Sequence, residues 1–205
     1  MRTHGNGHCL QTDLSPQKKL QGLLEDKFLL EGRGQRETIR NNLVPKKVNI
    51  FISRVLHKPI PVLVELDKSG IDLNSVRCPI CDDDVETIDH SLIFCTSAFD
   101  IWSKVYKWWG IGPYSNLSIH ESFSGKLNIS ISELGMKIWQ AVEWMCGYLL
   151  WKNRNNKVFK NKSWSGPSAL NEIQILSFDW ISRRIKNVQL DWYTWLVNPH
   201  SYLQI

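Results

Sequence analysis

Apolar residues recur at helical spacing in several stretches of the chain, and the first of these follows Pro45. The positions i, i+3, i+4, i+7 and i+8 of this stretch are Val48, Phe51, Ile52, Val55 and Leu56. The residues expected on the opposite face are Lys47, Asn49, Arg54 and Lys58. We therefore predict an amphipathic helix from Lys46, with Pro45 in its first turn. A second helix is predicted from Pro61 to Lys68, with Gly70 as its left-handed C-cap.

Shorter patterns follow these two helices. Apolar and polar residues alternate, as in an extended segment, at Ile71, Leu73 and Val76. Thr87 is placed to cap a short helix that begins near Ile88. Ser97 is placed to cap a longer one, whose apolar face consists of Phe99, Trp102, Tyr106 and Trp109. The signals that end this helix are Gly110, Gly112 and Pro113.

The longest helical pattern lies in the C-terminal half. Residues 110–128 are rich in Gly, Ser and Asn and predict a loop or linker before it. Ser130 and Glu133 fit a capping box. The apolar stripe that follows consists of Leu134, Ile138, Val142, Met145 and Leu149 and continues towards Phe159. After a break at residues 165–167, a second stripe consists of Leu170, Ile173, Leu176, Trp180, Ile181 and Ile185. The tail residues Trp192, Trp195 and Leu196 are expected to pack back on these helices.

Composition adds a basic balance and an uneven distribution of tryptophan. The 205 residues suffice for one sizeable domain or two small ones. All ten tryptophans lie at or beyond Trp102, which predicts a Trp-rich C-terminal region. The formal net charge of +5 is compatible with a nucleic-acid partner but does not require one.

No signal for secretion or membrane insertion is expected in the chain. Residues 1–22 contain no apolar run of secretory length. The most apolar helical stretch, Ala141–Trp151, is too short to span a bilayer and carries Glu143. We therefore expect an intracellular protein, nuclear or cytoplasmic, with no membrane partner. The clustered cysteines agree, because in a reducing compartment such clusters bind metal more often than they form bridges.

The stretch from Cys78 to Cys95 contains three thiols and one imidazole with the spacing C-x2-C-x8-H-x4-C. Cys78 and Cys81 can face one point from a tight turn that Pro79 favours. His90 and Cys95 can supply a second pair of ligands from the short helix and its end. We predict a Cys3His zinc site with the ligands Cys78, Cys81, His90 and Cys95. The alternatives are a disulfide, which a reducing compartment disfavours, and four unrelated buried side chains.

A zinc site of this composition predicts a structural role. Three thiolates and a neutral imidazole fill all four positions around Zn2+ and leave none for an activated water. The neighbouring acidic run, Asp82–Asp84, is interpreted as a solvated turn, because carboxylates on consecutive residues cannot all face one magnesium ion. We therefore expect no enzyme activity from this stretch.

Several short segments together resemble a known family. They are Leu43–Phe51 (Leu-Val-Pro-Lys-Lys-Val-Asn-Ile-Phe), Ser69–Ile71, Cys78–Cys81, Glu86–Thr87 with His90, and Cys95 with Ile101–Trp102. Their combination resembles the reverse-transcriptase zinc-binding domain of plant non-LTR (LINE-type) retrotransposons, over residues 41–110. Leu150–Asn155 and Val158–Phe159 resemble a Trp-Lys-x-Arg-Asn segment that often follows this domain in plant copies. The resemblance implies an RNA-directed DNA polymerase as the parent protein, but nothing in this chain resembles the aspartate pair of the polymerase palm.

These observations predict a mainly α protein, in which a small zinc-stapled helical module is followed by a C-terminal Trp-rich helical region. Residues 1–40 are expected to form a poorly ordered N-terminal segment, with a helical stretch only at Leu20–Leu30. Residues 41–110 form the predicted zinc-binding domain and 111–129 a linker. The C-terminal helical region is predicted at 130–205.

Two functions are consistent with the sequence. The first is a non-catalytic accessory module that contacts RNA or DNA through basic helix faces, since the acidic residues of the zinc loop, Glu86 among them, would repel phosphate. The residues predicted for this contact are Lys46, Lys47, Arg54, Lys58, Lys152, Arg154, Lys157, Lys160 and Lys162. The second is a structural module, or an inactive retroelement remnant, whose partner would be a retroelement-encoded protein. Tryptophans at core-facing positions favour the second function. The sequence does not indicate an oligomeric state.

Overall fold

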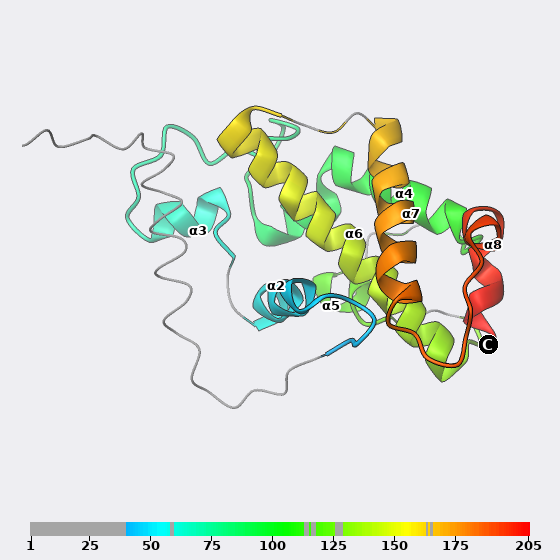
Figure 1. The fold of residues 1–205 in the computed structure, drawn as a ribbon. Helices are drawn as coiled ribbons and strands as arrows, with labels where there is room; N and C mark the ends of the chain where they lie inside the picture. The colour runs from blue at the N-terminus through cyan, green and yellow to red at the C-terminus, as the bar shows by residue number, and fades with distance from the viewer. Residues whose placement is uncertain are drawn as a thin grey trace, which may run out of the picture. The chain divides into compact units, whose positions relative to one another are not determined.

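The computed structural model describes residues 40–57, 60–112, 115, 118–125, 129–162, 164 and 166–205. All of these residues belong to one compact unit. Its elements are α2 (Lys46–His57), α3 (Leu63–Lys68), η1 (His90–Phe94), α4 (Thr96–Trp108), α5 (Ile119–Ser122), α6 (Glu133–Lys160), α7 (Gly166–Ser182), α8 (Trp192–Val197) and η2 (Pro199–Leu203) (Figure 1). The described residues form no strand beyond an isolated bridge between Arg77 and Val85. The predicted mainly α class is confirmed.

Some predictions fall on residues outside the described ranges. They are the poorly ordered segment up to residue 39, its helix at Leu20–Leu30, and the placement of Lys58. Within the described part of the chain, no helix combines the length and the apolar character needed to cross a membrane.

The helix predicted from Lys46 is confirmed as α2. Its apolar stripe is buried, and Phe51 packs against Tyr148 and Trp151 of α6 at ring-centroid distances of 5.7 and 6.3 Å. The second predicted helix is α3, which begins two residues after Pro61. Gly70 follows it with a positive φ of 80°, the left-handed conformation that glycine adopts at low cost.

The helix after the predicted zinc ligands begins earlier than expected. Cys95, not Ser97, is the N-cap of α4, and its carbonyl accepts a hydrogen bond from Phe99 N at 2.8 Å. The predicted apolar face is correct for Trp102 and Trp109, which are fully buried. It is wrong for Phe99, which is exposed at the edge of the buried stripe; that stripe consists of Ala98, Ile101, Trp102, Val105 and Tyr106.

The predicted linker, residues 111–129, contains the short helix α5. Ser118 and Glu121 form a capping box at its start. Phe123, which follows the helix, is buried, and its carbonyl accepts a hydrogen bond from Trp144 Nε1 of α6 at 2.8 Å. The segment around α5 therefore packs on α6 and is hydrogen-bonded to it. The division of the sequence into two regions at this place stays a prediction.

The long helix predicted in the C-terminal half is confirmed as α6, but its cap differs. Ser132 accepts a hydrogen bond from Gly135 N at 2.8 Å, so Ser132 and not Ser130 caps the helix. The helix runs without interruption to Lys160 and ends at Asn161, whose φ of 49° is left-handed.

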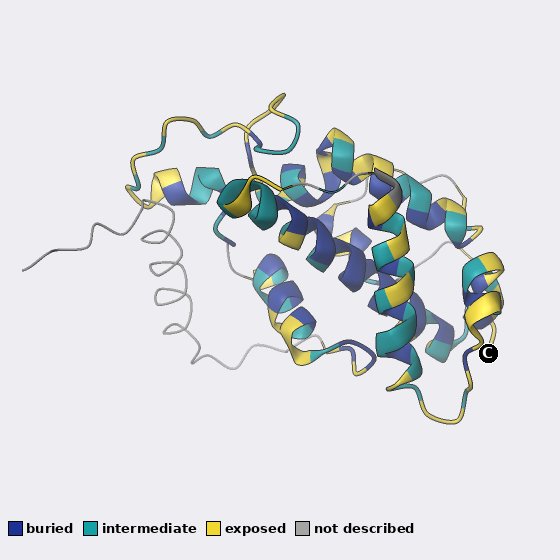
Figure 2. Ribbon diagram, turned by 45° about the horizontal axis from the view of Figure 1, so that its top comes forward, coloured by how far each residue is buried: buried dark blue, intermediate teal, exposed yellow. Residues whose placement is uncertain are grey.

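Helix α6 is the central element of the unit. It contacts α2, α7, η1 and η2, and Figure 2 shows its middle part as buried. Residues 141–147 are buried on every side of the helix, as expected for a helix that is covered all round. α2 and η1, which carry predicted site residues, therefore both pack against α6, which carries others.

The C-terminal elements fold back on α4 and α6. The break at residues 165–167 restarts the chain as α7, although Ile185, predicted for its stripe, lies beyond its end. An aromatic cluster is formed by Trp109, the C-cap of α4, with Trp139 of α6 and Trp195 of α8. The ring centroid of Trp109 lies 5.4 Å from that of Trp139 and 5.3 Å from that of Trp195. The prediction that the tail packs back is confirmed for Trp195, which is fully buried.

Candidate metal centre

The first two predicted ligands lie on a tight turn. Cys78 N donates to Asp84 O at 2.7 Å, and Asp82 N donates to Cys78 O at 2.9 Å. Asp82 takes a left-handed φ of 59°, which Asp tolerates better than most residues because its short side chain bonds locally. The bridge between Arg77 and Val85 closes the base of this turn. Both cysteines are thereby fixed on one small loop.

The second pair comes from η1, a turn of π-helix. Thr87 Oγ1 accepts a hydrogen bond from His90 N at 3.0 Å, which confirms Thr87 as the cap predicted for this short helix. Cys95 N donates to His90 O at 2.7 Å, the i to i+5 bond that defines a π turn. This wider turn brings residues five apart in sequence to one side, as the spacing of His90 and Cys95 requires. The short helix was predicted, but its π form was not.

The structure brings the four predicted ligands together. One ligand atom from each of Cys78, Cys81, His90 and Cys95 lies within 4.8 Å of the others. The Sγ atoms of Cys78 and Cys95 are 4.0 Å apart, and Cys81 Sγ is 3.3 Å from His90 Nε2. Zn–S bonds of about 2.3 Å in a tetrahedron would place two sulfurs about 3.8 Å apart, so the donor set fits a tetrahedral ion.

The electrostatic surroundings suit a closed site. Cys78, Cys95 and His90 are buried, and Cys81 is half-buried. A hydrogen bond from the Cys78 thiol proton to Cys95 raises the pKa of Cys78 and lowers the pKa of Cys95. A bound cation would replace that proton, because a coordinating thiol is deprotonated outright.

The imidazole of His90 is oriented by groups on both sides. Its Nε2 faces Cys81, while Nδ1 lies 3.6 Å from Asp84 Oδ2. A carboxylate beside the second nitrogen is the usual outer partner of a metal-binding histidine and favours a proton on Nδ1. Asp82 and Asp83 are exposed, as predicted for a solvated turn. Of the acidic run, Asp84 therefore has a position relevant to the site.

Glu86 differs from the other acids of the zinc loop. It was grouped with residues that repel phosphate, but it is fully buried and bound by Arg154. Arg154 Nε donates to Glu86 Oε1 at 2.6 Å, and Arg154 NH2 donates to Oε2 at 2.5 Å. The prediction of Arg154 as a nucleic-acid contact is wrong for the folded chain, because its guanidinium is buried and neutralised.

The other basic residues predicted for nucleic-acid contact are differently placed. On α2, Lys46 and Lys47 are exposed and Arg54 is half-buried. Lys47 Nζ lies 5.5 Å from the ring centroid of Tyr148 and 5.3 Å from that of Trp180. The ammonium group of Lys47 is therefore held over aromatic rings on α6 and α7.

The lysines of α6 and the following residues remain near the surface. Lys152 is exposed, and its Nζ lies 3.0 Å from Oε1 of Glu172 on α7. Lys157 is half-buried and donates to Asn161 Oδ1 at 3.1 Å, while Lys160 and Lys162 are exposed. These four lysines therefore lie on the predicted basic surface, whereas Arg154 is buried and does not.

Comparisons with known proteins agree with the site. No curated protein and no solved structure matches the chain significantly. Residues 29–102 match a family model described as zinc-binding in reverse transcriptase. The match contains Cys78, Cys81, His90 and Cys95, and it is to this zinc-binding domain and not to a polymerase catalytic domain. The chain therefore contains a segment similar to the zinc-binding domain of reverse transcriptases.

Proposed function

We propose that this chain is a non-catalytic, zinc-binding accessory module derived from the RNA-directed DNA polymerase of a plant LINE-type retrotransposon. The observation that carries this proposal is the convergence of Cys78, Cys81, His90 and Cys95 within 4.8 Å. Three thiolates and one imidazole form the donor set of structural zinc sites. The plant origin rests on the sequence segments that resemble the plant copies.

The non-catalytic character follows from the number of protein donors. Zinc bound by four side chains has no coordination position left for a substrate or a nucleophilic water. The role of the ion is then to hold the loop that carries Cys78 and Cys81 on η1 and on the start of α4.

Metal analysis tests the zinc part of the proposal. Purified wild-type protein should contain about one zinc per chain, and Co2+ in its place should give the intense visible absorption of a tetrahedral thiolate site. Cys78→Ser should lose both signals. Cys9→Ser, which removes a cysteine outside the cluster, should keep them. A wild-type protein without stoichiometric metal, or one with the weak absorption of an octahedral site, would overturn the proposal.

We further propose that RNA or DNA binds on the helices and not on the zinc loop. The residues that remain for this contact are Lys46, Lys47, Arg54, Lys152, Lys157, Lys160 and Lys162, together with Lys58, which lies outside the described residues. The loop itself exposes Asp82, Asp83 and Asp84, which repel phosphate.

Salt-dependent binding of single-stranded RNA tests this contact. Replacing Lys152, Lys157, Lys160 and Lys162 by Gln should weaken binding and reduce its salt dependence. A matched control removes four cations that are each paired with an acid three or four residues earlier in the chain, at Lys68, Lys104, Lys137 and Arg183. Equal loss in both variants would indicate a general charge effect and would contradict a contact at this surface.

A structural or protein-interaction module is the second candidate function. It is favoured by the pairing of the predicted cations within the fold, namely Lys47 over aromatic rings, Lys152 with Glu172 and Arg154 with Glu86. Cations held in this way have less charge available for phosphate. A wild-type protein that binds zinc but shows no salt-sensitive RNA binding would favour this function.

A further inference from the structure

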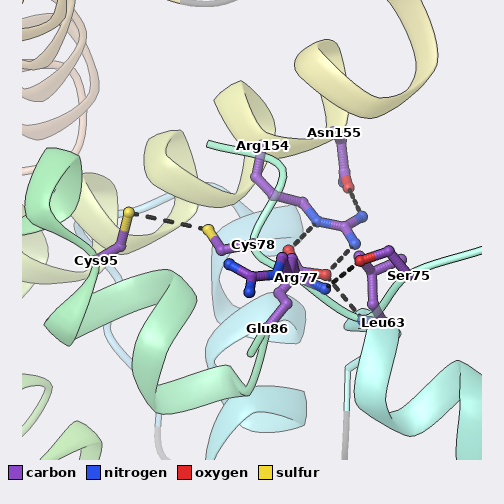
Figure 3. Close-up of polar contacts among 8 residues, drawn as sticks. All are labelled: Leu63, Ser75, Arg77, Cys78, Glu86, Cys95, Arg154 and Asn155. Atoms are coloured by element: carbon purple, nitrogen blue, oxygen red, sulfur yellow. Dashed lines mark hydrogen bonds and ion pairs between the residues drawn. The ribbon is translucent and has the colours of Figure 1, made fainter. Parts of the chain in front are cut away.

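We propose that Arg154 on α6 is a positioning residue of the metal centre, so that the fold which holds the metal extends beyond the matched zinc-binding segment. This inference rests on the proposed zinc binding. Arg154 lies 68 residues from Glu86 in sequence, and Figure 3 shows its side chain pointing from α6 toward Glu86 in the zinc loop.

Glu86 occupies the middle of the metal-binding loop. It lies between Cys81 and His90, the last ligand of the first pair and the first ligand of the second. Its amide donates to Val76 O at 2.8 Å, across the base of the loop that carries Cys78 and Cys81. A shift of Glu86 would therefore change the position of one ligand pair relative to the other.

The Glu86 carboxylate is satisfied by two separate elements. Both of its oxygens accept hydrogen bonds from Arg154, and Oε2 also accepts one from Leu63 N at 2.8 Å, at the start of α3. Charge-assisted bidentate bonds of this kind are among the strongest hydrogen bonds in proteins, and they fix direction as well as distance. The carboxylate thus joins the zinc loop to α3 and α6.

Arg154 is itself held in place. Its NH1 group donates to Asn155 Oδ1 at 3.1 Å, and its guanidinium lies 5.0 Å from the ring centroid of Trp151. The Trp151 ring stacks on Phe51 of α2. The Trp-Lys-Asn-Arg-Asn run of residues 151–155 therefore contacts both α2 and the zinc loop, which gives a physical role to a segment known until here only as a resemblance.

Because both residues of the pair are buried, neither side chain can be hydrated if the other is removed. Glu86 is 0% exposed and Arg154 is 3% exposed. A carboxylate buried without its partner cation is strongly unfavourable, so the loop would have to move to hydrate Glu86. The matched segment ends at residue 102 and does not include Arg154. A chain cut after that segment should therefore hold its metal weakly.

Zinc affinity, measured by competition with a chromophoric chelator, tests this inference. Arg154→Met should lower the affinity by about 10- to 100-fold, the usual effect of removing an outer partner of a metal site. Arg154→Lys keeps the charge but not the bidentate fork, so its affinity should lie between those of Arg154→Met and the wild type. Glu86→Gln should weaken zinc binding too, and adding it to Arg154→Met should cost less than the sum of the single changes.

The control variants change cations without contact to the loop. Lys137→Gln removes an exposed cation on α6, and Arg183→Gln removes an exposed cation just after the end of α7. Both should leave zinc affinity unchanged within about twofold, as expected for exposed surface substitutions. The absorption spectrum of bound Co2+ should change in Arg154→Met and stay as in the wild type in both controls.

The possible results separate this inference from the proposed function. If the wild type binds no zinc, the proposed function and the inference both fail. If the wild type binds zinc, and Arg154→Met lowers the melting temperature but leaves the zinc affinity and the Co2+ spectrum unchanged, Arg154 has only a general structural role and the inference alone is overturned. If Arg154→Met does not fold, the affinity of Arg154→Lys decides: a loss supports the inference, and wild-type affinity contradicts it.

Discussion

Two buried carboxylates differ in the groups that surround them. Glu86 accepts hydrogen bonds from the Arg154 guanidinium on both of its oxygens. Glu143 of α6 is also fully buried, but it accepts a hydrogen bond from the Gly125 amide at 3.0 Å. Burial raises the pKa of Glu143 well above its ordinary value, so we expect the protonated form in the folded chain.

The raised pKa of Glu143 predicts a pH dependence of stability. The contribution of the protonated Glu143 carboxyl to the free energy of unfolding is fully present below the ordinary carboxyl pKa. It is lost as pH rises through the raised pKa of the folded state. In Glu143→Gln the side chain keeps nearly the same shape but has no group that ionises. The variant should therefore melt higher than the wild type at alkaline pH, by at least about 2 °C, with a smaller difference at pH 6. Thermal unfolding at both pH values checks this, and an equal difference at both would contradict it.

The ligands and their partners differ in how far sequence could predict them. Cys78, Cys81, His90 and Cys95 were predicted because metal chemistry allows few residue types and fixes their spacing. The pair of Glu86 and Arg154 was missed, because its members are far apart in sequence and each alone looks like a solvated charge. The available signal was that both residues lie in segments that resemble the family, Glu86 in Glu86–Thr87 and Arg154 in Leu150–Asn155.

At the level of elements, the helices with strong apolar periodicity were predicted well. α2 and α7 follow the pattern because one face of each is buried, while α6 carries the predicted stripe and is buried on every side at residues 141–147. The short α5 was missed, since four residues carry no periodicity, and its stability comes from packing of Phe123 on α6. Helix starts were less certain, because Ser130 and Ser132 are both acceptable caps by residue type.

The cap of α6 can be decided by substitution. Ser132→Ala should lower the free energy of unfolding by about 1 kcal/mol, because it removes the acceptor for Gly135 N. Ser130→Ala, at the position predicted from the capping-box pattern, should change it by less than about 0.5 kcal/mol. Denaturant unfolding of the two variants measures both values. The reverse order would show that the helix begins at Ser130 in solution.

The docking of η2 on α6 predicts a second stability effect. A Cβ atom added at Gly135 would lie 2.2 Å from Leu203 O, a backbone atom that cannot move alone. Gly135→Ala should therefore destabilise the protein by about 1–3 kcal/mol, although alanine favours helices. Gly112→Ala, where a Cβ would meet nothing within 4 Å, is the matched control. A neutral or stabilised Gly135→Ala would mean that η2 does not rest on α6.

At the scale of the whole molecule, metal centre and aromatic cluster belong to one packed unit. Trp102 of α4 donates from Nε1 to Leu92 O in η1 at 2.8 Å, and Trp109 of the aromatic cluster is the C-cap of the same helix. Arg154 adds a second connection from the zinc loop to α6. Because these contacts share α4 and α6, we expect the metal centre and the C-terminal helices to unfold together.

Removal of the metal is the most direct test of this account. Bound zinc stabilises comparable small folds by on the order of 10 kcal/mol, most of the stability expected for a chain of this size. Treatment of zinc-loaded protein with a strong chelator should reduce the helical circular dichroism signal, and tryptophan fluorescence should change with it in one transition. Unchanged helicity, fluorescence and melting temperature after complete removal of the zinc would contradict the central claim that the metal holds this fold together.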